Sequence, residues 1–163
     1  AGNSASADEN VGTTTDYTST QGVKASTTGT VYGVYDMSGG AWEYVAAYVN
    51  NGNSSLTSYG SALLNGESKT KNVYSKASSD NRYDNYNRNS GKYGDAVYET
   101  SAVDNIKYGL SWYQDYDTFP YENQPFFIRG GDRIQDTGAG VFCFNILAGY
   151  GSSNSFRPVL ALL

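Results

Sequence analysis

The spacing of large apolar residues predicts a few short strands separated by long polar stretches. Residues 31–35 (VYGVY) favour a strand, and the turn residues at 38–40 end it. A second structured segment begins at Trp42. The alternation of Trp42 with Tyr44 favours a strand, whereas Ala46 and Ala47 favour a helix, and both types stay open.

The middle of the chain is polar and gives weaker signals. Residues 50–92 are rich in Asn, Ser, Gly and Lys, which is typical of a long surface loop. Residues 93–103 suit a short helix with Asp95 as its N-cap.

Aromatic residues gather in the region 108–131, and we expect core there. The cluster comprises Trp112, Tyr113, Phe119, Phe126, Phe127 and Ile128. The sequence predicts a strand at Phe126–Arg129 that ends at Gly130 and Gly131. Further on, it predicts a short strand over 141–144, a loop over 145–154 and a closing strand over 156–162. Pro158 lacks an amide donor, which favours either an edge position for that last strand or a bulge at this residue.

Length and composition indicate one domain with an N-terminal extension. The chain has 163 residues, among them 16 Tyr and 19 Gly. Residues 1–29 are mostly small and polar, which predicts a flexible or surface-lying segment. Residues 30–163 form the predicted domain. Tyr, Ser, Gly and Asn, which are abundant here, are also enriched in antibody binding loops.

Charge and residue types exclude several function classes. The net charge is −5 and no basic run occurs, which argues against a nucleic-acid partner. No stretch approaches the length of a membrane span. The sequence has no histidine and one cysteine, Cys143, which excludes a Ser-His-Asp triad, a Cys-His pair and the common zinc sites. A structural calcium ion held by Asp and Asn oxygens remains an alternative.

Three stretches together resemble one family. They are Gly33–Tyr44 (GVYDMSGGAWEY), Arg129–Gly131 (RGG) and Ser155–Leu160 (SFRPVL). In order and spacing they resemble the formylglycine-generating-enzyme branch of C-type lectin folds, and in particular the variable proteins of diversity-generating retroelements. The resemblance spans roughly residues 30–160. It implies an α+β C-type lectin fold with short strands, few helices and long irregular loops. Arg157, between Phe156 and Val159, is expected either to point away from the core face or to be buried against a carboxylate, with Glu43 as a candidate partner.

The resemblance also implies a variable region at about 130–156. In variable proteins, adenine-directed mutagenesis of asparagine-type codons cannot produce Lys, Glu, Gln, Met or Trp, and between Gly131 and Phe156 only Gln135 breaks this rule. Residues 139–142, Phe144 and Ser155 are expected to be fixed scaffold. The candidate ligand-binding positions are Asp132, Arg133, Ile134, Asp136, Thr137, Cys143, Asn145, Ile146, Leu147, Tyr150, Ser152, Ser153 and Asn154.

The expected function is therefore recognition without catalysis or cofactor. A stiff scaffold would present these side chains as one surface, extended by Tyr113 and Tyr116, to a protein or glycan on a cell or host surface. Such a protein is expected to be extracellular, on a cell surface or on a virion surface. Asp132 and Arg133 would set the charge preference of the surface.

Other functions stay open beside this one. Formylglycine-generating enzymes use a pair of active-site cysteines. Because Cys143 is the only cysteine of this sequence, their chemistry is excluded. A hydrolase built on Asp115 with Asp117, or on Asp132 with Asp136, has no spacing signature to support it. A calcium-dependent lectin and a non-diversified adhesin head of a pilus or virion are the remaining alternatives.

Overall fold

The described chain consists of short strands and short helices, with all four α-helices between β1 and β3. The computed structural model describes residues 18–20, 22–26, 28–33, 41–91, 94–104, 109–132, 138 and 140–150. The strands are β1 (Glu43–Asn50), β2 (Asn72–Ser75), β3 (Ser101–Ala102), β4 (Gly109–Ser111), β5 (Tyr116–Asp117), β6 (Phe126–Arg129) and β7 (Phe144–Leu147). The helices are α1 (Ser54–Tyr59), α2 (Ser61–Asn65), α3 (Arg82–Arg88) and α4 (Ala96–Thr100), with 3-10 turns η1 (Gly22–Ala25), η2 (Ser68–Thr70) and η3 (Trp112–Gln114).

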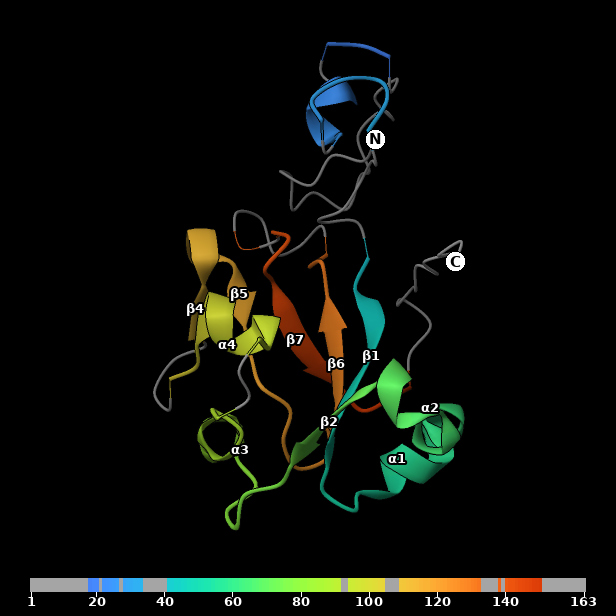
Figure 1. Ribbon diagram of the computed structural model, residues 1–163, viewed down its shortest axis with the longest axis vertical. Helices are drawn as coiled ribbons and strands as arrows, with labels where there is room; N and C mark the ends of the chain where they lie inside the picture. Colours follow the sequence, from blue (N-terminus) through green and yellow to red (C-terminus); the bar gives the residue numbers. More distant parts are fainter. Residues whose placement is uncertain are drawn as a thin grey trace.

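In the described part of the chain, seven strands form one mixed sheet in the order β2-β1-β6-β7-β5-β4-β3 (Figure 1). β1 runs parallel to β2, and β5 runs parallel to β7, whereas the other neighbours are antiparallel. The register of β1 against β6 shifts between Tyr44 and Tyr48, where β1 bulges. Helices and a mixed sheet in one unit make this an α+β protein, as the sequence predicts.

Strand β6 contributes core side chains to both faces of the sheet, because successive side chains of a strand point to opposite sides. Phe127 joins the core under α3 and α4, where Phe119 and Phe144 are fully buried. The rings of Phe119 and Phe127 meet edge to face, with centroids 5.1 Å apart. These contacts fix β6, β7 and β5 relative to the helices.

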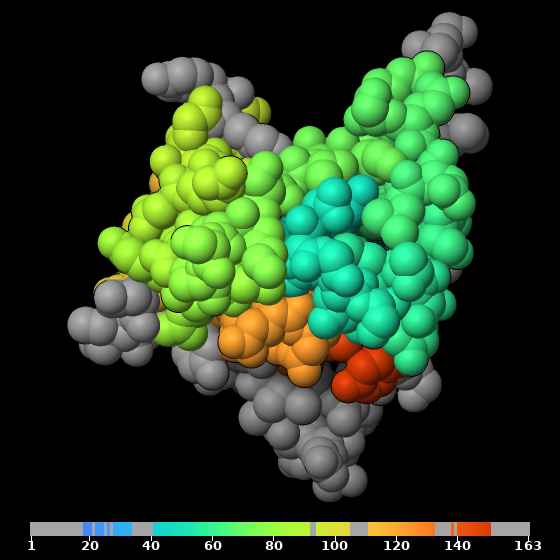
Figure 2. Space-filling model, turned by 90° about the horizontal axis from the view of Figure 1, so that it is seen from below, coloured from blue at the N-terminus to red at the C-terminus, as the bar shows by residue number. Residues whose placement is uncertain are grey.

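The opposite face of the sheet is covered at one side by α1 and α2. Leu56 of α1 packs on Tyr48 and Phe126, and the α2 leucines pack against the same group. Seen from below in Figure 2, the segment holding α1 and α2 (green) lies on one side and that holding α3 (lime) on the other, with cyan atoms of the end of β1 between them.

The first predicted strand and the predicted polar loop differ from the structure. Residues 31–33 form a turn, and residues 34–35 lie outside the described residues. The segment 50–92, predicted as surface loop, holds α1, α2, β2 and α3. Asn53 and Asn81 cap two of these helices by accepting hydrogen bonds from the amides of Ser55 and Asp84. Asparagine thus begins helices here, whereas its abundance favours a loop prediction.

Other elements confirm the sequence predictions. The segment from Trp42 continues as strand β1, which settles the open choice between strand and helix. Asp95 caps α4 by accepting a 3.0 Å hydrogen bond from the amide of Val97. β6 covers the predicted residues, and it ends where Gly130 and Gly131 adopt φ values of 87° and 68°. The predicted closing strand, with Arg157 and Pro158, lies outside the described residues.

Candidate binding surface

The tight connection between β4 and β5 holds two large aromatic side chains in solvent. Trp112 is 55 % exposed and Tyr113 is 85 % exposed. Tyr113 and Gln114 adopt φ values of 63° and 66°, in the left-handed region that costs a non-glycine residue roughly 1–2 kcal/mol. Such strain is concentrated at functional sites in proteins. The sequence prediction that Trp112 and Tyr113 belong to the core is therefore wrong, whereas Phe119, Phe126, Phe127 and Ile128 are buried as predicted.

A second turn, at residues 140–143, lies against the first. Oδ2 of Asp115 accepts a 2.9 Å hydrogen bond from the backbone N–H of Phe142. The Ser111 hydroxyl donates to the carbonyl of Phe142 at 3.2 Å. Gly140 allows this approach, because a Cβ there would lie 1.9 Å from Asp115 Oδ2. The two turns are thus fastened together by a buried carboxylate and a hydroxyl.

The rings carried by these turns are ordered against one another. Phe142 contacts Trp112 at an interplanar angle of 64° with centroids 5.3 Å apart, and it stacks on Tyr113 at 5.8 Å. Val141, beside them, is 52 % exposed. We name the set Trp112, Tyr113, Val141 and Phe142 the aromatic end surface. Turn η3 caps the upper end of β4 and β5 in Figure 1.

Asp115 is the electrostatic anchor of this surface. It is nearly fully buried, and burial raises the pKa of its carboxyl, while the backbone amides of Phe142 and Cys143 oppose the rise. The carboxylate is thereby committed to the backbone of the second turn. Asp117, which the alternative hydrolase interpretation pairs with Asp115, is fully buried, so its side chain cannot contact a substrate in this structure.

The candidate ligand-binding residues in the described chain do not share one surface. Asp132 is half-buried and follows β6, at the end of the sheet where Arg129 pairs with Phe144. Tyr150 is 64 % exposed and follows the opposite end of β7. Arg133, Ile134, Asp136, Thr137, Ser152, Ser153 and Asn154 lie outside the described residues.

Two candidates, one directly before β7 and one within it, are corrected by the structure. Cys143 has no exposed surface and packs with Trp42 and Ile128, and Ile146 is 7 % exposed. Neither side chain can contact a ligand in this structure. Ile146 is buried because β7 begins at Phe144, so residues 145–147 belong to the sheet and not to the predicted loop. Asn145 and Leu147 alternate with the buried positions and are half-buried.

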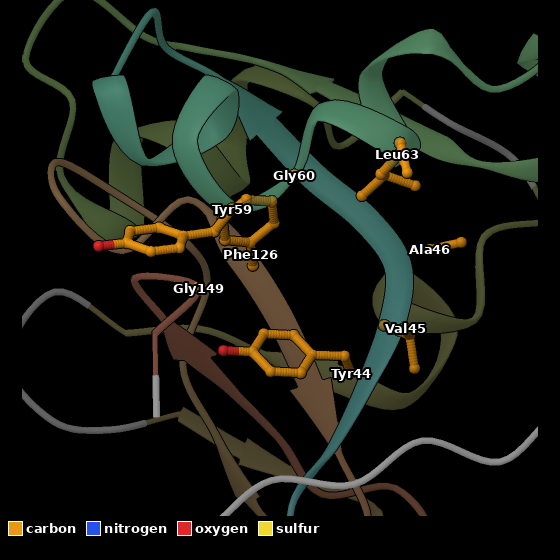
Figure 3. Close-up of a pocket in the computed structure, with 9 residues that line it drawn as sticks. Tyr44, Val45, Ala46, Tyr59, Gly60, Leu63, Phe126 and Gly149 are labelled. Atoms are coloured by element: carbon orange, nitrogen blue, oxygen red, sulfur yellow. The ribbon is translucent and has the colours of Figure 1, made fainter. Parts of the chain in front are cut away.

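Tyr150 contacts Tyr59, one of the residues that line a small apolar pocket. Figure 3 shows this pocket. The ring of Tyr150 lies 5.7 Å from that of Tyr59, and the pocket has a volume of about 290 Å³. The ring of Tyr44 points toward Gly149 across the pocket, and Phe126 forms part of its wall. This end of β7 therefore offers an aromatic pocket, separate from the aromatic end surface.

Sequence reasoning missed part of the aromatic end surface. Val141 and Phe142 are expected as fixed scaffold from the resemblance, yet Val141 is largely exposed. A local signal was present in Gln114 and Asp115, because two polar residues directly after Trp112 and Tyr113 indicate a turn and not a continuous core strand.

The described residues hold no metal centre and no membrane span. No group of three or more Asp, Glu, Cys or His side chains in the described ranges is arranged to hold a metal ion. Among the helices of the same ranges, none is both long and apolar enough to cross a bilayer.

Comparison with known proteins does not assign the chain to a family. No protein-family model, no curated protein and no solved structure matches it.

Proposed function

We propose that the chain is a C-type-lectin-like ligand-binding display domain, of the kind found in retroelement variable proteins, and that it binds a protein or glycan on a cell or host surface. The observation that carries the proposal is the aromatic end surface. Large apolar side chains at solvent-exposed positions, gathered in one place, mark contact sites more often than they mark architecture.

The construction of the surface supports binding. Tyr and Trp provide large contact areas at a small cost in side-chain entropy, and such residues dominate binding hot spots. Asp115 and Gly140 fix the two turns before any ligand arrives, which lowers the ordering cost of association. Asp132 lies at the same end of the sheet as the aromatic end surface. Among the described candidate positions, it is the one that suits a variable edge of that surface.

The retroelement part of the proposal concerns residues 130–156. Burial of Cys143 and Ile146 restricts tolerated exchange there to the other candidate positions. A near-copy of the last coding segment, with adenines at those positions and a reverse transcriptase gene beside it, is the expected genomic arrangement. Sequencing the gene's neighbourhood tests this, and absence of both features would reduce the proposal to a binding domain of fixed sequence.

The proposal assigns no catalysis and places the domain outside the cell or on a virion. The binding test uses the labelled full chain on a glycan array and on immobilised cell-surface proteins. Trp112→Ser combined with Tyr113→Ser should abolish any specific binding found, while Tyr83→Ser, at an exposed position of α3, should leave it unchanged. Equal binding by the double variant and the control would refute the role of the aromatic end surface.

A further inference from the structure

A second cavity lies between β1, β2, β6 and the start of α4, on the α3–α4 face of the sheet. Its volume is about 350 Å³, within the range of small-molecule sites. Ala47, Val97 and Phe127 give it apolar walls, and Arg129 and Asp95 bring opposite charges to it. The cavity shares no residue with the aromatic end surface, so a ligand bound in it would be independent of the proposed function.

Arg129 brings a positive charge to this cavity. Its guanidinium lies 6.0 Å from the centre of the Phe144 ring and is half-buried. Burial lowers its pKa, while Cys143, Tyr74 and Asp95 oppose that change. No hydrogen bond or ion pair to this guanidinium occurs in the part of the chain that the structure describes. A partly desolvated cation of this kind is stabilised by an anion that can accept its paired donors.

Asp95 is held in place on the other side of the cavity. Its Oδ2 accepts a 2.7 Å hydrogen bond from the Tyr74 hydroxyl, and its Oδ1 accepts from the amide of Val97. Each oxygen keeps a lone pair for a further donor. Asp95 and Arg129 line the same cavity, yet within the described residues they form no direct ion pair. Opposite charges held apart in one cavity suit a ligand that carries both charges itself.

We propose that this cavity binds a small zwitterion with a short apolar side chain, the size of a branched-chain amino acid. The ligand carboxylate pairs with Arg129, and its ammonium group donates to Asp95. Its side chain lies against Val97 and Phe127. A phosphate dianion is disfavoured, because it would place a second negative charge near Asp95.

Isothermal titration of the full chain tests the class of ligand. The probes are L-valine, 3-methylbutanoate, which lacks the amino group, isobutylamine, which lacks the carboxylate, and inorganic phosphate. Valine is expected to bind, with both single-charge analogues at least about tenfold weaker and phosphate not bound. Absence of valine binding, or phosphate binding as tight as valine, would overturn the proposal.

Matched variants locate the site. Arg129→Gln should abolish valine binding, and Arg129→Lys, which keeps the charge and loses the paired donors, should weaken it about tenfold. Asp95→Asn keeps an N-cap for α4 and should reduce valine binding to the level of 3-methylbutanoate. Arg88→Gln, on the exposed side of α3, is the control and should bind valine normally. Melting curves confirm that each variant is folded, and valine binding that survives in a folded Arg129→Lys or Asp95→Asn protein at full strength contradicts the assignment.

Discussion

The carboxylate of Asp115 accepts a 2.9 Å hydrogen bond from the backbone of Phe142, a residue 27 positions further along the chain. Together with the hydrogen bond from the Ser111 hydroxyl to the Phe142 carbonyl, this contact joins the β4–β5 turn to the turn before β7. It also removes the Phe142 amide from sheet pairing, so that Val141 and Phe142 stay in a turn at the edge of the core. The aromatic end surface thus depends on a buried polar group that it does not expose.

Asp115→Ala should destabilise the protein by about 2–4 kcal/mol, because it leaves buried backbone donors without their acceptor. Denaturant titration measures the loss in the free energy of unfolding. Glu99→Ala, at an exposed site of α4, is the matched control and should change stability by less than about 0.5 kcal/mol. Equal stability of the two variants would show that Asp115 is not the anchor.

The buried Asp117 predicts a specific dependence of stability on pH. Among the described residues neither of its carboxylate oxygens has a hydrogen-bond partner, and burial raises its pKa from 3.8 to about 7, with Arg82 opposing the rise. In the unfolded chain the group ionises near its ordinary value. The folded state therefore binds the extra proton between about pH 4 and pH 7, and the stability contributed by this group falls as pH rises through that window and is constant above it.

Asp117→Asn removes this titration. The free energy of unfolding of the variant, relative to the wild type, should rise between about pH 4 and about pH 7 by an amount on the order of 3 kcal/mol. Chemical denaturation at several pH values measures the difference. If the two stability profiles run parallel over that window, the carboxylate does not titrate as proposed.

Cys143 should be unreactive in the folded protein. It has no exposed surface, and burial, aided by the charge of Asp115, raises the pKa of its thiol to about 12. A disulfide reagent at about pH 8 should label it only at the rate of unfolding, whereas labelling in denaturant should be immediate. Fast labelling under native conditions would show that the Cys143 thiol is exposed in the folded protein and would contradict this prediction.

The candidate positions should differ sharply in how much stability an amino-acid substitution costs. Ile146→Asn buries an amide in the core and should cost about 2–4 kcal/mol, whereas Tyr150→Asn, at an exposed site, should cost far less. Thermal melting curves of the two variants and of the wild type compare the losses in stability. Similar losses at the two positions would mean that the burial pattern of β7 does not govern which residues can vary.

Sequence patterns were informative where the signal is local. The N-cap at Asp95 and the apolar strand ending in two glycines depend on neighbouring residues, and both are found in the structure. The α+β class, in contrast, is what the resemblance of the three stretches implies. The two local predictions needed no knowledge of distant contacts.

The site was harder to predict, because its geometry is set by long-range contacts. The apolar run 141–147 fits a strand at several registers, and a shift of a residue exchanges the buried and exposed faces. The register in the structure is that of the pairing with β6, and the contact from Asp115 to the second turn spans 27 positions, so neither can be seen in the local sequence. Trp112 and Tyr113 have the composition of core residues, and only the strained turn that carries them makes them surface.

Hydrogen–deuterium exchange with a bound ligand from the array tests the central claim most directly. The aromatic end surface predicts slower exchange in peptides covering 109–115 and 140–143 on ligand addition, with exchange in α3 unchanged. Protection confined to α1, α2 or β2, with none over the two turns, would contradict it.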